Sequence, residues 1–96
     1  MEMVEINGVK AKVARTLFAR MKGLIGTKCL PPGEGMLILH CKAIHTFFMS
    51  FPIDAIFLDR EGHVVKVVRN IRPGRFFVWG GFRADRVLEV ASDSGR

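Results

Sequence analysis

The strongest indication of the fold is the opening stretch Val4-Glu5-Ile6-Asn7-Gly8-Val9-Lys10-Ala11-Lys12-Val13. Asn-Gly is the preferred pair for a two-residue turn whose central residues both have positive φ, and such a turn joins adjacent antiparallel strands. The alternation of apolar residues around it predicts that Ile6 pairs with Val9. On the opposite face Glu5 would lie across from Lys10, an attraction of about 0.2–1 kcal/mol. The sequence therefore predicts a β-hairpin over residues 3–14.

The apolar period changes after the hairpin. The next apolar residues recur at the spacing of one face of an α-helix: Leu17, Phe18, Met21, Leu24 and Ile25. We therefore expect one short amphipathic α-helix over about residues 16–25, with its apolar face in the core. Short apolar runs separated by Gly- and Pro-containing turns then predict a β-rich remainder over residues 36–91. Because most connections are tight, the expected architecture is mainly β (β-rich α+β), a compact antiparallel sandwich or barrel.

Length and composition limit the class of protein. The chain has 96 residues, 49% of them hydrophobic and 25% charged, which is typical of one folded domain over residues 1–96. A net charge of +6 favours anionic partners. The uncharged runs fall short of the roughly 18 residues that a membrane span needs, and no leader pattern opens the chain. We expect a cytoplasmic protein with no membrane partner, in which Cys29 and Cys41 stay reduced.

The central block is Cys41-Lys42-Ala43-Ile44-His45-Thr46-Phe47-Phe48-Met49-Ser50-Phe51-Pro52-Ile53-Asp54-Ala55-Ile56-Phe57-Leu58-Asp59. This block resembles the domain-of-unknown-function 192 family, small prokaryotic proteins without an established biochemical role. Three further segments resemble that family's other motifs: Arg20-Met21-Lys22-Gly23-Leu24-Ile25, Gly35-Met36-Leu37 and Val87-Leu88-Glu89-Val90. The resemblance runs from about Val9 to Gly95. It implies a mainly β fold with a jelly-roll-like or barrel-like sheet, and it implies no activity.

Asp54 is the most informative polar residue. It stands in a predicted strand over residues 53–59 in which both faces are apolar, so we expect its carboxylate to be at least half buried. A buried carboxylate must be paired or hydrogen-bonded. We favour an anchor that ties residues 42–52 to the sheet through Thr46 or through backbone amides. The alternative is an acid, a base or a ligand-binding group in a cleft.

A candidate ligand site follows from the irregular segment before this strand, because binding groups are often carried on loops. Near residues 41–54 we expect a cleft formed by polar groups and aromatic walls, namely His45, Thr46, Phe48, Asp54 and Trp79. Trp79 before Gly80-Gly81 is also typical of a sugar-stacking platform. The favoured function is a non-enzymatic binding or accessory module for an unknown small molecule, with carbohydrates among the candidates.

The basic residues suggest a second function. Residues 60–86 contain seven basic and two acidic residues, interleaved with Phe76, Phe77, Trp79 and Phe82. Cations beside aromatic rings are typical of surfaces that hold single-stranded nucleic acid. The candidate polyanion contacts are Arg69, Arg72, Arg75 and Arg83. A solvated edge that discourages sheet pairing explains the same pattern, and no nucleic-acid-binding motif accompanies it.

A weaker alternative uses the Cys41 and His45 pair. Cysteine activated by histidine is a nucleophile, and cysteine, histidine and the thioethers of Met36 and Met49 are soft metal ligands. The chain contains no Cys-x-x-Cys pair and no recognised nucleophile motif. We therefore expect no catalytic residues, no metal site and no cofactor.

Overall fold

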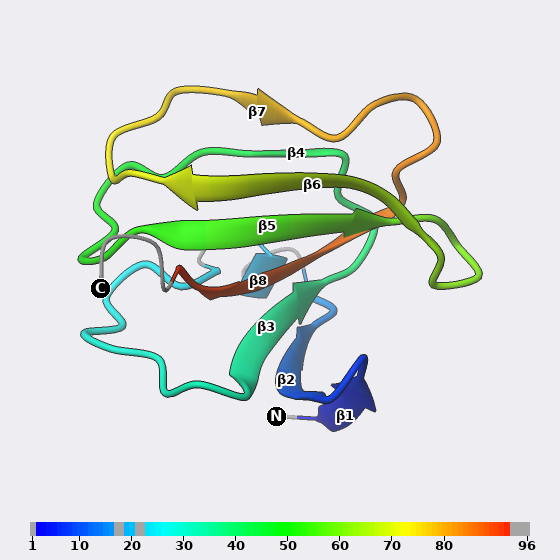
Figure 1. The fold of residues 1–96 in the computed structure, drawn as a ribbon, viewed down its shortest axis with the longest axis horizontal. Helices are drawn as coiled ribbons and strands as arrows, with labels where there is room; N and C mark the ends of the chain where they lie inside the picture. The colour runs from blue at the N-terminus through cyan, green and yellow to red at the C-terminus, as the bar shows by residue number, and fades with distance from the viewer. Residues whose placement is uncertain (1, 17–18, 21–22, 93–96) are drawn as a thin grey trace.

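The computed structural model describes residues 2–16, 19–20 and 23–92, and these residues form a mainly β structure (Figure 1). Its strands are β1 (Met3–Ile6), β2 (Val9–Ala14), β3 (Glu34–Ile38), β4 (Ala43–Ile44), β5 (Ile53–Leu58), β6 (Val64–Ile71), β7 (Val78–Trp79) and β8 (Arg86–Ala91). Six of them form one sheet in the order β1-β2-β3-β8-β5-β6, while β4 and β7 pair separately. The predicted mainly β class is confirmed. No helix in the described part of the chain is long and apolar enough to cross a membrane.

The N-terminal hairpin is confirmed in both its turn and its register. Asn7 and Gly8 have φ values of 51° and 80°, as a turn with two left-handed central residues requires. β1 and β2 pair antiparallel with Glu5 opposite Lys10. The local sequence is therefore sufficient to set this element.

The sheet departs from a purely antiparallel arrangement in one pair. β2 and β3 run parallel, with Lys10 opposite Glu34, while the other four pairings are antiparallel. A parallel pair cannot be joined by a tight turn and needs a crossover of about a dozen residues or more. The segment 15–33 provides that crossover. It also carries the turn that borders the candidate site described below.

The predicted helix over about residues 16–25 falls only partly within the described residues. Ala19 and Arg20 are helical, and the Thr16 hydroxyl accepts a hydrogen bond from the Ala19 amide at 3.0 Å, as an N-cap does. Gly23 has a φ of 50°, which is not a helical value, and residues 23–26 form turns. At this end the helix is therefore shorter than the predicted span of about residues 16–25. Three residues of the predicted apolar face lie outside the described residues, namely Leu17, Phe18 and Met21.

The core lies on both faces of the large sheet because β5 is buried on both sides. Ile53, Ala55 and Phe57 belong to one apolar cluster, and Leu58 belongs to the other. The backbone of Gly80 packs against the first cluster, where an added Cβ would lie 2.2 Å from the Phe57 ring. This contact holds the segment that contains β7 against the large sheet.

Candidate functional site

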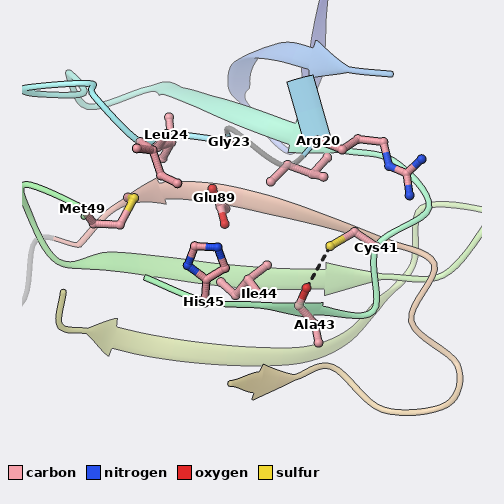
Figure 2. A pocket seen from close by; sticks show the side chains of 11 residues that line it. Arg20, Gly23, Leu24, Cys41, Ala43, Ile44, His45, Met49 and Glu89 are labelled. Atoms are coloured by element: carbon pink, nitrogen blue, oxygen red, sulfur yellow. Dashed lines mark hydrogen bonds between the residues drawn. The ribbon is translucent and has the colours of Figure 1, made fainter. Parts of the chain in front are cut away.

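A cavity of about 350 Å³ lies between the turn at residues 23–25, the segment 41–49 and strand β8 (Figure 2). Its walls are mostly apolar and include Leu24, Ile44 and Met49. Glu89 of β8 contributes a carboxyl group to this lining, so we call the space the Glu89 cavity. Each of the three lining parts comes from a segment that resembles a motif of the family named above.

Glu89 is placed there by the alternation of β8. Leu88 faces one apolar cluster, while Val87 and Glu89 face the other side of the sheet, where the cavity lies. Glu89 is only 4% exposed, and burial raises the pKa of its carboxyl group to about 7. Among the described residues, none forms a hydrogen bond or ion pair with this carboxyl group. Near neutral pH it therefore exists in both protonation states.

Arg20 borders the same cavity without neutralising Glu89. Its Nη2 donates a hydrogen bond to the His40 carbonyl at 3.0 Å. In Figure 2 its guanidinium group points away from Glu89. Within the described part of the chain, the Nε of Arg20 is buried without a hydrogen-bond partner. Two polar groups along one cavity thus keep unused hydrogen-bonding capacity.

Cys41 and His45 both line the cavity, yet they do not form an activated pair. The Cys41 thiol donates a hydrogen bond to the Ala43 carbonyl at 3.0 Å, and burial raises its pKa. A nucleophilic cysteine needs the opposite shift. His45 accepts a hydrogen bond at Nδ1 from the Phe47 amide. This geometry gives the Cys-His alternative no support.

The soft-metal alternative stays a prediction, because its Cys41 and His45 do not belong to a cluster of ionisable ligands. Among the His, Cys, Asp and Glu side chains of the described residues, one group of three is close enough to share an ion, namely Asp59, Glu61 and His63 in the turn between β5 and β6. There the Asp59 carboxylate already accepts hydrogen bonds from the Glu61 and His63 amides. Cys41 and His45 are not part of this group.

Asp54 is buried, as expected from the sequence, with 7% of its surface exposed. Its Oδ1 accepts a hydrogen bond from the Asn70 amide at 2.8 Å, and its Oδ2 lies 3.8 Å from the Arg69 guanidinium group. Asn70 has a φ of 53°, which interrupts the regular register between β5 and β6. The carboxylate thus accepts a backbone amide as expected. Its partner, however, lies in β6 and not in residues 42–52.

Thr46 anchors the segment 42–52, but to the loop after β6 and not to Asp54. It is fully buried, and its hydroxyl donates to the Arg72 carbonyl at 2.7 Å and accepts from the Arg75 amide at 2.8 Å. Its backbone carbonyl also accepts from the Gly74 amide at 2.9 Å. Thr46 therefore joins the loop after β4 to the loop after β6.

The five residues predicted to form a ligand site occupy several places. His45 lines the Glu89 cavity, whereas Asp54 lines a different cavity beside Arg69. Phe48 is 83% exposed, and Trp79 packs edge-on against Phe82 with ring centroids 4.8 Å apart. Thr46 is enclosed by its hydrogen bonds. The ligand-binding role of each residue remains a prediction.

Among the predicted polyanion contacts, Arg72 and Arg75 stand exposed on the loop that Thr46 holds. Arg69 forms an ion pair with Asp54, and Arg83 lies in the segment between β7 and β8. The role of these four arginines in binding polyanions stays a prediction.

Glu89 was missed by the sequence reasoning, although a signal was present. The run Val87-Leu88-Glu89-Val90 places a carboxylate on the same strand face as Val87. The argument that identified Asp54 as buried applies equally to Glu89. What no strand pattern could indicate is the empty space beside it.

Comparison with known proteins identifies a family. The model of the family DUF192, described as "Uncharacterized ACR", matches residues 2–95. A UPF0127 protein of Thermococcus sibiricus is 40% identical over 76 residues, which cover 72% of this chain and 47% of that protein. The chain therefore spans about half the length of the curated relative it matches.

Two crystal structures show the same fold with a TM-score of 0.81 each. One is a protein of unknown function from Novosphingobium aromaticivorans, 23% identical, with 88% of this chain and 64% of that chain covered. The other, from Sinorhizobium meliloti, is described as a candidate transcription regulator and is 19% identical, with 88% and 69% covered. These two structures show the fold, and the family match over residues 2–95 shows that the chain belongs to the DUF192 family.

Proposed function

We propose that the Glu89 cavity binds a small organic molecule and that the protein acts as a small-ligand binding or accessory module. The observation that carries this proposal is the Glu89 carboxyl group, which is buried in the cavity wall and has no partner among the described residues. Burying a polar group without a hydrogen bond costs several kcal/mol. A ligand that supplies a donor to this group would offset that cost.

The shape and lining of the cavity support a compact ligand. A volume of about 350 Å³ falls within the range of pockets that take small molecules. The apolar walls around Leu24, Ile44 and Met49 favour a ligand with an apolar body. Figure 2 shows the Glu89 carboxyl group between Leu24 and the His45 ring, where the polar end of such a ligand would lie. The ligand class is thus a small apolar molecule that bears one amine, amide or hydroxyl donor.

His45 would then contribute at the entrance. It is exposed and lines the cavity, so its ring is available to a bound molecule and to solvent. Replacement by alanine should weaken binding less than a change of Glu89, because an exposed contact remains partly solvated when a ligand binds.

The test is a ligand panel built from matched pairs, each pair sharing one apolar skeleton with and without a donor group. Thermal unfolding of the wild-type protein is measured with each member. A ligand at 100 times its Kd stabilises the folded state by about 2.7 kcal/mol. For a domain of this size, that stabilisation raises Tm by at least about 10 °C. Only the donor-bearing members should produce it.

Two variants identify the site. Glu89→Leu should abolish the difference between the members of each pair, because it removes the acceptor. Asp54→Asn is the matched control, since Asp54 is also a buried acid but lines another cavity. The proposal is contradicted if no donor-bearing compound raises Tm, or if Glu89→Leu responds to the pairs as the wild-type protein does.

A further inference from the structure

Three phenylalanine rings gather on the surface at the loops after β4 and β6. The Phe47 ring lies 6.4 Å from that of Phe48 and 5.9 Å from that of Phe76, measured between centroids. Phe48 is 83% exposed and Phe76 is 79% exposed. We call these three residues the aromatic platform. Bulky apolar side chains that remain this exposed often mark an interaction surface.

The platform is held in place from below. Phe47 and Phe48 follow Thr46, and Phe76 follows Arg75, so the hydrogen bonds between Thr46 and the 72–75 loop fix both halves of the platform together. Because Thr46 is fully buried, water does not compete for these bonds. The rings are therefore presented on a rigid support and not on two independent loops.

The backbone at Phe48 is unusual for such a residue. Its φ is 65°, a left-handed conformation that is rare for bulky side chains. Burial in the core does not explain it, since the ring projects into solvent. Backbone strain of this kind concentrates at functional sites. It points to a function for the exposed ring itself.

The two loops of the platform carry charge of one sign. Residues 45–52 and 70–77 contain two basic residues, Arg72 and Arg75, and no acidic residue. Arg72 and Arg75 are exposed on the loop that carries Phe76, and their guanidinium groups form no hydrogen bond or ion pair within the described part of the chain. A partner of this surface should be anionic and should offer flat or apolar groups to the rings.

We propose that the aromatic platform binds single-stranded nucleic acid, with bases stacked on its rings and phosphates at Arg72 and Arg75. Exposed aromatic rings accept unstacked bases irrespective of sequence, and cations beside them hold the backbone. An anionic membrane is a less suitable partner, because interfacial anchors are typically Trp and Tyr whereas all three platform rings are Phe. Both basic residues of the two loops are arginine, which contacts phosphate in a bidentate manner. None of the three platform residues lines the Glu89 cavity, although the Phe47 ring lies 5.8 Å from that of His45, which does. Stacking on the platform does not require a ligand in that cavity.

The experiment measures fluorescence anisotropy of a labelled oligothymidine of about twelve nucleotides, a length within known site sizes of ~4–16. The wild-type protein should bind it more tightly than a duplex of the same length. The logarithm of affinity should fall with the logarithm of salt concentration at a slope of about −1.4, or −0.7 for each of two phosphates.

Variants separate stacking from charge. Phe48→Ser and Phe76→Ser should each weaken binding about tenfold and leave the salt slope unchanged. Arg72→Gln and Arg75→Gln should each reduce the slope by about 0.7. Phe82→Ser is the matched aromatic control, because Phe82 is 86% exposed but packs against Trp79 outside the platform. It should bind as the wild-type protein does.

Three outcomes would overturn the proposal. One is the absence of oligothymidine binding at low salt. Another is binding that the platform variants and the Phe82→Ser control weaken equally, which would indicate charge attraction without stacking. The third is sedimentation with phosphatidylserine-containing vesicles together with no binding to the oligonucleotide, which would assign the surface to a lipid. Circular dichroism of each variant verifies that the fold is retained.

Discussion

Glu89→Gln tests whether the cavity carboxyl group is buried without a partner. The folded-state pKa of about 7 lies above the unfolded value of 4.5, because burial disfavours the charged form. Between these pH values the folded protein keeps a proton that the unfolded chain has released. The contribution of Glu89 to the free energy of unfolding is therefore fully present below about pH 4.5, falls as the pH rises toward 7 and is lost above that.

The size of the effect follows from the same interval. From 4.5 to about 7, at about 1.36 kcal/mol per pH unit, the loss is about 3 kcal/mol. Glu89 is 4% exposed, so solvent screening reduces this value little. Gln has nearly the same shape and carries no charge at any pH. The variant should match the wild-type protein near pH 4 and should exceed its stability by up to about 3 kcal/mol at pH 8.

The assay is urea unfolding, followed by circular dichroism, at several pH values between about 4 and 8. Titration of the three histidines affects both proteins and cancels in their difference. Glu34→Gln, which removes an exposed glutamate from β3, is the matched control and should not show the pH-dependent gain. A Glu89→Gln difference that is the same at pH 4 and pH 8 would refute the reasoning.

Three further changes test the backbone and the loop support. Phe48→Gly should be more stable than Phe48→Ala by about 1 kcal/mol in urea unfolding, because glycine adopts a φ of 65° without steric cost; equal stabilities would argue against strain at this position. Thr46→Val should lower the unfolding free energy by about 2–4 kcal/mol, because it leaves the Arg75 amide and the Arg72 carbonyl without the bonds that the Thr46 hydroxyl makes. Thr46→Ser should retain most of the stability. Gly35→Ala should lower Tm markedly, because the added Cβ would lie 2.7 Å from the Glu89 carbonyl oxygen; an unchanged Tm would show that β3 and β8 can separate freely.

The hairpin and the burial of Asp54 were predictable because each depends on residues close together in the sequence. Asn7-Gly8 sets a turn with positive φ at both positions, and the alternating residues beside it set the register. Asp54 lies in a strand with apolar neighbours on both faces, so its burial follows from strand geometry alone.

The partners of the buried polar groups were not predictable in the same way. Asp54 binds the Asn70 amide because β6 departs from regular pairing at that point, a feature that arises only when β5 and β6 meet. The parallel pairing of β2 and β3 likewise depends on the whole crossover segment. Such contacts join residues far apart in the chain, and local pattern carries no information about them.

The sequence by itself thus determined the mainly β class, the N-terminal hairpin and the family to which the chain belongs. Tertiary structure alone decided that Glu89 borders an apolar cavity and that Thr46 brings the two loops of the aromatic platform together. The physical reason is that strand period and turn chemistry act over a few residues. A cavity or a surface patch, by contrast, exists only where distant segments pack against each other.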